Sequence, residues 1–542
     1  MPSKTILLLK TSLPFIIALC CALSVFGQSG SKPSMRILFI PLDDRPPCLQ
    51  FTIKMGMIGN AELVTPPKAL LGRYTTAGQC SRIIEWLQQQ NLKSFDAAIV
   101  SLDMLVYGGL VASRVFDVPT GLALQRVDVL HTLRSKAPKL AIYAQSVIMR
   151  LAPTADGKND AYRADLSKWA EISVKTDEAS KGETAALEKK IPAEGLDNYK
   201  QARQRNLTLN LKAVEYVRSG VINYLILSQD DAKPVGVHVA DRLRLIDETN
   251  RLALTGKIAV QPGADEVSML LLARAVNHYF TVSPTVKAIY SSATAAGTVM
   301  PFEDKPLRET VSFHIRATGS SEVQEEGADL LFYVFASRRE PGSAAAFAAA
   351  IAEKIKQGRH VMVADIDPVG DVQGGDSVFT RELISRGLLP ELNSYASWNT
   401  AANTIGTTLP QGIVFEAAVA KLLGNKSIAA RVWSAQNWFT FHRVIDDCYF
   451  HGATRLAVNK YFGQEKLSSK ILDEKTNLAV EQYTVQLLLQ PFHSLGEVYT
   501  HKISGSRQRQ VQCTRPANLS FHLPWNRTFE AEIDFDMACK VK

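Results

Sequence analysis

Adjacent pairs of aspartate occur at Asp43-Asp44 and Asp230-Asp231, and each pair directly follows a short apolar run. One helix cap accounts for one carboxylate, not for two. Neighbouring carboxylates repel each other, so each pair needs an arginine, a cation or a bound proton. Two carboxylates are also sufficient for the acid and base steps of glycoside hydrolysis. We therefore predict that Asp44, Asp230 and Asp231 are catalytic, together with Asp103, which follows another apolar run.

Further polar and aromatic side chains follow other apolar runs, and we expect them to bind substrate together with Asp43. They comprise two arginines, two carboxylates, two amides and three aromatic rings: Arg45, Arg150, Asp265, Glu266, Asn399, Asn403, Tyr107, Tyr395 and Trp398. Each type also has a simpler structural explanation. Asp265 and the two asparagines suit helix caps or turns, and Tyr395 and Trp398 suit an apolar core.

This set of side chains favours a carbohydrate ligand, because carboxylates and amides bond sugar hydroxyls and aromatic rings stack on sugar faces. The sequence has no HExxH motif, no GxSxG elbow and no glycine-rich phosphate loop after a strand. These absences argue against a histidine-ligated zinc site, a serine hydrolase and a nucleotide-binding enzyme. We expect no cofactor and assign no metal ligand, although the same oxygens would suit a divalent cation such as Mg²⁺ or Ca²⁺.

Ten short apolar runs recur from Arg36 onward, with amphipathic stretches between them. Runs of four to six buried-type residues are typical of strands covered on both faces of a parallel sheet. The predicted strands are Ile37–Pro41, Glu62–Thr65, Ala97–Ser101, Leu140–Ala144, Tyr224–Ser228, Ile258–Gln261, Lys287–Ser291, Leu330–Phe335, His360–Ala364 and Leu392–Ala396.

Strands that alternate with helices predict a mainly parallel α/β fold, and ten strands fit two doubly wound, Rossmann-like sheets. A (β/α)8 barrel with extra strands is the alternative. In either fold the carboxyl ends of the strands open on one face, so the candidate site residues would converge there. We place a first α/β domain at 35–283, with a helical insertion at 155–200, and a second at 284–425. A helical and mixed region follows at 426–542, with short strands expected at Tyr483–Leu489 and Phe529–Phe535.

The first 28 residues have the pattern of a secretory signal peptide. Lys4 and Lys10 precede the apolar run Leu13–Phe26, and small or polar residues follow. An uncleaved anchor and lipidation at Cys20 are the alternatives. We expect a periplasmic or extracellular protein with no further membrane span. The remaining cysteines, Cys48, Cys80, Cys448, Cys513 and Cys539, are few and far apart, so they predict no disulfide framework. The net charge of +8 comes from scattered basic residues and predicts no nucleic-acid partner.

Three long motifs carry a family resemblance: Ile40–Pro46, Ser101–Leu110 and Ser397–Thr404. With Ser228–Asp231 and Arg443–Tyr449, they resemble a bacterial family known as domain-of-unknown-function family 4127. The resemblance covers about Arg36 to Phe462 and implies kinship without a mechanism. A local likeness also links Val217–Asp231 to barrel hexosaminidases with adjacent catalytic carboxylates, in which one carboxylate orients the substrate and the next protonates the leaving oxygen.

The leading hypothesis is an exported carbohydrate-active hydrolase that uses paired carboxylates at strand ends. A hydrolase or isomerase dependent on a divalent metal is the second hypothesis. A non-catalytic glycan-binding protein of the cell surface is the third.

Overall fold

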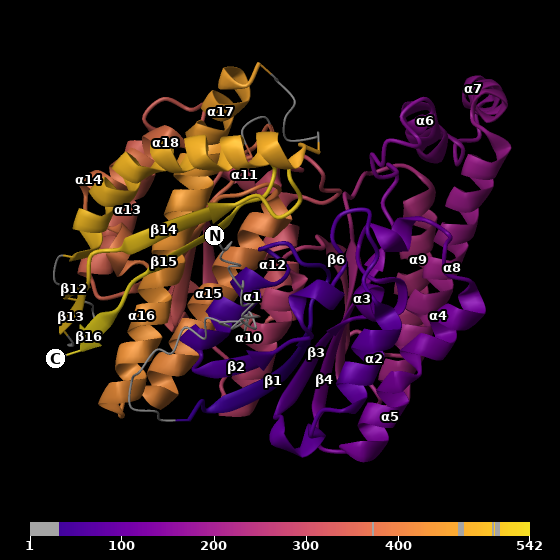
Figure 1. Ribbon diagram of the computed structural model, residues 1–542. Helices are drawn as coiled ribbons and strands as arrows, with labels where there is room; N and C mark the ends of the chain where they lie inside the picture. The colour runs from indigo at the N-terminus through magenta and orange to yellow at the C-terminus, as the bar shows by residue number, and fades with distance from the viewer. Residues whose placement is uncertain (1–31, 371–372, 464–470, 501–502, 505–509, 542) are drawn as a thin grey trace, which may run out of the picture. The chain divides into compact units, whose positions relative to one another are not determined.

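The first sheet contains six parallel strands in the order β2-β1-β3-β4-β5-β6 (Figure 1). Every residue of β3 and β4 is buried, as expected for strands covered on both faces. Each of the first six predicted strands corresponds to one of these, although β4 runs four residues further than predicted. The strands are β1 Met35–Ile40, β2 Ala61–Val64, β3 Ala97–Ser101, β4 Ala141–Ile148, β5 Tyr224–Gln229 and β6 Ile258–Pro262.

The second sheet contains five parallel strands in the order β11-β10-β9-β7-β8. Both sheets are open and built from parallel strands with helical crossovers, so the two-sheet prediction is confirmed and the barrel alternative is not formed. The strands are β7 Thr285–Tyr290, β8 Ser321–Glu322, β9 Leu330–Phe335, β10 His360–Asp365 and β11 Ser394–Ala396. The second sheet starts just after residue 283, while the predicted division into domains stays a prediction.

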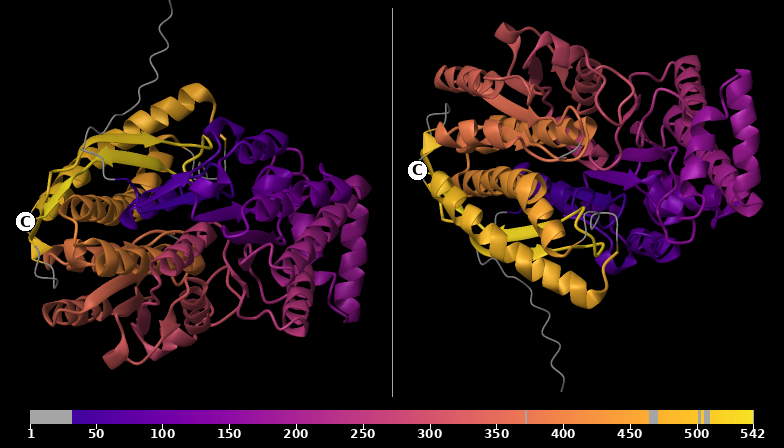
Figure 2. Two further views of the ribbon diagram at one scale, coloured as in Figure 1. Left: turned by 90° about the horizontal axis from the view of Figure 1, so that it is seen from below. Right: turned by 90° about the horizontal axis from the view of Figure 1, so that it is seen from above.

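Four helices join the two halves of the fold. α1 (Gln50–Ile58) and α10 (Val267–Phe280) belong to the first half, and they pack against α15 (Ala401–Leu422) and α16 (Lys426–Arg443) of the second. Figure 2 shows the indigo and orange segments lying side by side in both views. Ten residues of α10, from Val267 to Asn277, are buried, because both halves cover this helix. One continuous apolar core therefore includes residues of both sheets.

Helices lie between β4 and β5, where the helical insertion was predicted. They are α6 (Arg163–Ile172), α7 (Glu178–Lys190) and the start of α8 (Ala193–Arg218). Trp169 and Tyr199 lie in a small apolar cluster of its own, separate from the main core. In Figure 1 the insertion lies on the side away from the orange and yellow segments.

The C-terminal region begins with α16 and continues through a π-helix, η6 (Val444–Thr454), to α17 (Arg455–Tyr461) and α18 (Glu474–Thr500). The predicted strand at 483–489 is wrong, because these residues lie within α18. Val480, Thr484, Leu488 and Phe492 are buried at intervals of four, which is a helical period. The small antiparallel sheets that follow are formed by β12 Ile503–Ser504, β13 Gln510–Cys513 and β16 Cys539–Val541, and by β14 Ala517–His522 and β15 Glu532–Asp536.

The strand predicted at 529–535 corresponds in part to β15. A disulfide joins Cys513 to Cys539, which are paired across β13 and β16.

The computed structural model describes residues 32–370, 373–463, 471–500, 503–504 and 510–541. The predicted signal peptide lies outside these ranges. Within them, no helix has the length and apolar character needed to span a bilayer. The remaining helices are α2 Cys80–Gln88, α3 Leu102–Tyr107, α4 Thr120–Val127, α5 Val129–Lys136, α9 Val237–Arg251, α11 Ala293–Gly297, α12 Leu307–Ala317, α13 Ser343–Lys356 and α14 Ser377–Ser385, with 3₁₀ turns η1 Lys68–Leu70, η2 Leu92–Ser94, η3 Ala112–Arg114, η4 Glu325–Gly327 and η5 Leu389–Glu391.

Candidate functional site

The motif after β1 forms the centre of a buried charge network. Arg45 Nη2 lies 2.7 Å from Asp43 Oδ2 and 2.7 Å from Asp265 Oδ1, and Arg45 Nη1 lies 3.4 Å from Glu530 Oε1. All four residues are buried. Arg527 makes a second pair with Glu530, at 2.5 Å. One guanidinium therefore joins residues that follow β1 and β6 to a carboxylate near the C-terminus.

Asp44 accepts a hydrogen bond of 2.7 Å from the indole nitrogen of Trp525. Burial raises the pKa of Asp44 to about 6, although the bond from Trp525 opposes the shift. Asp103 lies at the start of α3, next to the topological switch point between β1 and β3. It accepts a 2.9 Å bond from the Val147 amide, and burial raises the pKa of Asp103 to about 7.

The Asp230-Asp231 pair after β5 is neutralised by two arginines. Asp230 lies 2.5 Å from Arg114, and Asp231 lies 2.5 Å from Arg150. Burial alone would raise the pKa of Asp230, but Arg114 and Arg150 outweigh it and lower the pKa below its usual value. Asp231 has a φ of 41° and a side chain that is 37% exposed, so it is the more accessible of the pair.

The remaining predicted residues fall into two groups. Tyr107 and Tyr395 are buried in the interior, where Arg205 lies over the Tyr107 ring and Tyr395 Oη lies 3.0 Å from Cys448 Sγ. Glu266 and Asn403 are buried where α10 meets α15 and share a 2.8 Å hydrogen bond.

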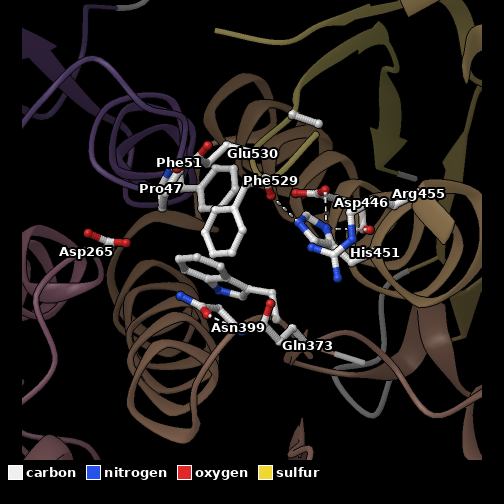
Figure 3. Close-up of a pocket in the computed structure, with 12 residues that line it drawn as sticks. Pro47, Phe51, Asp265, Gln373, Asn399, Asp446, His451, Arg455, Phe529 and Glu530 are labelled. Atoms are coloured by element: carbon white, nitrogen blue, oxygen red, sulfur yellow. Dashed lines mark hydrogen bonds and ion pairs between the residues drawn. The ribbon is translucent and has the colours of Figure 1, made fainter. Parts of the chain in front are cut away.

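A small pocket lies where both halves of the fold meet the C-terminal region (Figure 3). Among the predicted residues, it brings together Asp265, Trp398 and Asn399. The pocket is also lined by residues not predicted as site residues: Pro47, Phe51, Gln373, Asp446, His451, Arg455, Phe529, Glu530 and Ala531. In the view of Figure 3, Asp265 lies on one side of Pro47 and Phe51, and Asp446, His451 and Arg455 lie on the other.

Asp446 and His451 come from η6, a π-helix of eleven residues. A π-helix bonds each residue to the fifth one along, so it stacks residues five apart, and such segments often occur at functional sites. His451 Nδ1 accordingly lies 3.0 Å from Asp446 Oδ1. Burial alone would raise the pKa of Asp446, but His451 and Arg443 outweigh it and lower the pKa. The adjacent pair Asp446-Asp447 was the available sequence signal for this part of the site, in a motif that the family resemblance had already marked.

The side-chain oxygens of Asp446 and Asp447 and a ring nitrogen of His451 lie within 4.8 Å of one another, a spacing that suits a metal ion. The ion pairs and hydrogen bonds that these three side chains already make argue against a metal site. Arg443 lies 2.5 Å from Asp446 and 2.9 Å from Asp447, and Asp447 also accepts a bond from the Ser397 amide. The ring nitrogens of His451 lie 3.1 Å and 2.9 Å from the carbonyl oxygens of Asp446 and Phe529. Both ring nitrogens therefore already face oxygens of the protein itself.

A family profile described as "protein of unknown function (DUF4127)" matches residues 37–534. No curated protein and no solved structure matches the chain.

Proposed function

Because the chain belongs to the DUF4127 family, whose description names no activity, we propose a function from the pocket itself: an exported hydrolase that acts on a carbohydrate. The observation that carries the proposal is the lining of the pocket. Aromatic rings from Phe51, Trp398 and Phe529 lie next to the carboxyl groups of Asp265 and Glu530. Aromatic faces suit the apolar faces of sugar rings, and carboxylates suit their hydroxyl groups.

The two sides of the pocket hold carboxyl groups in different states. Burial raises the pKa of Asp265 to about 6, and Arg45 offsets only part of that effect. Asp446, on the other side, is held ionised by His451 and Arg443, which lower its pKa. Carboxyl groups whose environments separate their pKa values are suited to act as proton donor and as base or nucleophile. We assign Asp265 as the proton donor and Asp446 as the ionised partner. Asp231 and Arg150 do not line the pocket, and we propose that they orient a part of the substrate that extends beyond it.

Two features support export. The first 28 residues have the pattern of a signal peptide. Cys513 and Cys539 form a disulfide across β13 and β16, and disulfides persist mainly in oxidising compartments. Fractionation of cells that express the full chain tests this part of the proposal. Recovery of the protein only in the cytoplasm, with both cysteines reduced, would contradict it.

Activity on a panel of glycans tests the enzyme assignment, with Asp265→Asn as the decisive variant. We expect turnover by the unaltered protein and a loss of at least about 100-fold in the variant, because general acid catalysis contributes about 10²–10⁴-fold. Glu326→Gln changes an exposed carboxylate outside the pocket and serves as the control. Full activity in a folded Asp265→Asn protein would refute the role of Asp265.

A metal-dependent hydrolase or isomerase is the second candidate, favoured by the spacing of Asp446, Asp447 and His451. Elemental analysis of the purified protein, followed by assay in EDTA, separates it from the first. A tightly bound divalent metal that is required for turnover would replace our proposal. Glycan binding without any turnover would instead favour a binding protein.

A further inference from the structure

Three polar side chains connect a buried carboxylate of the first half to the pocket. Glu266, at the start of α10, accepts a 2.8 Å hydrogen bond from Asn403 Nδ2. Asn403 Oδ1 in turn accepts a 2.8 Å bond from Asn399 Nδ2. Asn399 lines the pocket. Glu266 is therefore connected through two side-chain amides to the lining of the pocket.

The hydrogen bonds of this relay all run in one direction. Glu266 Oε2 also accepts a 3.1 Å bond from the Ala264 amide, so two N–H groups point to the same oxygen. Asn403 must then direct its NH₂ group toward Glu266 and its carbonyl toward Asn399. The Thr400 hydroxyl supports this orientation, because it donates to Asn403 Oδ1 at 3.0 Å and accepts a bond from the Asn403 backbone amide.

Asn399 is oriented by the same rule. If its side chain were flipped, its carbonyl would face the carbonyl of Asn403, and two acceptors would meet without a hydrogen. One N–H of its NH₂ group therefore donates to Asn403, and Asn399 Oδ1 is directed away from Asn403. Gln373 Nε2 donates to this oxygen only at a long 3.4 Å. Asn399 thus offers an acceptor that a ligand can use.

The origin of the relay is rigidly held. Glu266 is fully buried, and two glycines leave the space for its side chain. A Cβ atom added at Gly406 would lie 2.1 Å from Glu266 Cγ, and one added at Gly263, where φ is 107°, would lie 1.7 Å from Glu266 Oε1. A side chain confined in this way cannot swing away to release Asn403.

We propose that Asn399 presents its carbonyl oxygen to the ligand and selects, at that point, a hydroxyl or ammonium group over a carboxylate or phosphate oxygen. Glu266 and Asn403 are positioning residues, because they act on the ligand only through Asn399. The proposal deepens the proposed function, since it takes the pocket as the place where the substrate binds.

Neutron crystallography of the full chain tests the orientation directly, because it locates the amide deuterons. We expect one deuteron of Asn399 Nδ2 to point to Asn403 and one deuteron of Asn403 Nδ2 to point to Glu266. A flipped Asn399 amide, with its oxygen toward Asn403, would overturn the proposal. This result does not depend on whether the ligand is a sugar.

Calorimetric binding of glucose, glucosamine and glucuronate tests the selectivity. We expect glucose or glucosamine to bind at least about tenfold more tightly than glucuronate, because a carboxylate facing the carbonyl loses a hydrogen bond and is repelled. Asn399→Leu should remove this difference. Preference for glucuronate in the unaltered protein would overturn the proposal. If none of the three sugars binds, the carbohydrate assignment fails, and the deuteron positions still decide the orientation.

Matched variants of Glu266 test the relay. The substitution Glu266→Gln keeps an oxygen for Asn403 and can place its new NH₂ group toward His314 Nε2, which lies 3.5 Å from Glu266 Oε1. This variant should therefore preserve the sugar preference. Glu266→Met has similar bulk without the acceptor and should reduce the preference to less than about threefold. Equal preferences in the two variants, with Asn399 unmoved in Glu266→Met, would show that the relay does not set the orientation.

Discussion

The two sheets resemble each other in strand order but carry different chemistry at their switch points. Between β1 and β3 of the first sheet lie Asp44 and Asp103, whose pKa values burial raises to about 6 and about 7. Between β7 and β9 of the second sheet, Ser291 Oγ and Ser337 Oγ lie 2.8 Å apart and satisfy each other. Arg338, which follows Ser337, lies 2.8 Å from the buried carboxylate of Asp365. The first switch point holds carboxyl groups that can exchange protons. At the second switch point the serine hydroxyls and Arg338 bind to neighbouring side chains of the same sheet.

This difference shows that the strand order determines where polar side chains gather. The hydrogen bonds and ion pairs of those side chains then determine whether they can still bind a ligand. The second half contributes to the pocket through the loop after β11, with Trp398 and Asn399, instead of through its switch point. The first half contributes Pro47, Phe51 and Asp265 to the pocket, and Arg45 connects Asp265 to Glu530. We therefore expect variants at the first switch point to affect both stability and the pocket, and variants at the second to affect stability alone.

The largest effect is expected for Arg45→Met. This change leaves the carboxylates of Asp43, Asp265 and Glu530 buried around an apolar side chain, and removing one partner of a buried pair costs about 3–5 kcal/mol. Urea denaturation at pH 7 measures the loss. Arg36→Met is the control, because its pair with Glu62 is largely exposed and contributes about 0–1 kcal/mol. Equal losses of unfolding free energy in the two variants would show that the ion pairs of Arg45 do not stabilise the fold more than an exposed pair does.

Arg338→Met should also destabilise the fold, by about 3 kcal/mol, because Asp365 is fully buried. Its effect on the pocket should differ from that of Arg45→Met. The folded fraction should keep its glycan turnover or binding, since Arg338 does not line the pocket. Denaturation and assay at a temperature well below the midpoint measure the two properties. A loss of function greater than the loss of folded protein would contradict the contrast between the switch points.

The pH dependence of stability should sharpen the comparison further. Because burial raises the pKa of Asp103 to about 7 from its usual 3.8, the folded protein binds more protons than the unfolded chain in this interval. The associated stability is complete below about pH 4 and is lost as the pH rises through about 7. Asp103→Asn, which stays neutral, should therefore be more stable than the unaltered protein at pH 8, by on the order of 2 kcal/mol. The difference should shrink toward pH 4. A constant difference across this range would refute the raised pKa.

The smallest effect on stability is expected for Asp231→Asn. Its side chain is 37% exposed, so its pair with Arg150 should contribute about 1 kcal/mol or less. The proposed orienting role nevertheless predicts a clear loss of glycan turnover. Thermal unfolding and the glycan assay distinguish the two effects. An Asp231→Asn protein with an unchanged fold and full turnover would remove Asp231 from the site.

Much of the fold could be predicted from local patterns. All ten strands predicted for the parallel sheets occur, because each is a short apolar run of the kind that such sheets contain. The segment 483–489 was misjudged because its valine, tyrosine and leucine residues suit a strand by composition, whereas their burial follows the period of a helix. Local composition could not distinguish the two, since the partner surface decides which period is buried.

The candidate site was less predictable. Asp265, Trp398 and Asn399 were identified because they follow strands whose ends must converge. Glu530 follows no strand of either parallel sheet, and nothing in its neighbourhood marks it as a partner of Arg45, which lies 485 positions earlier in the chain.

The sequence by itself determined the α/β class, the strands and the chemical types available at their ends, because these depend on local hydrophobic patterns. Only the tertiary structure decided which of those groups meet. Arginines neutralise Asp230 and Asp231, and the C-terminal segment brings Phe529 and Glu530 into the pocket. The physical reason is that charge pairing and burial depend on distances in space between residues that are remote in the chain, and no local pattern encodes those distances.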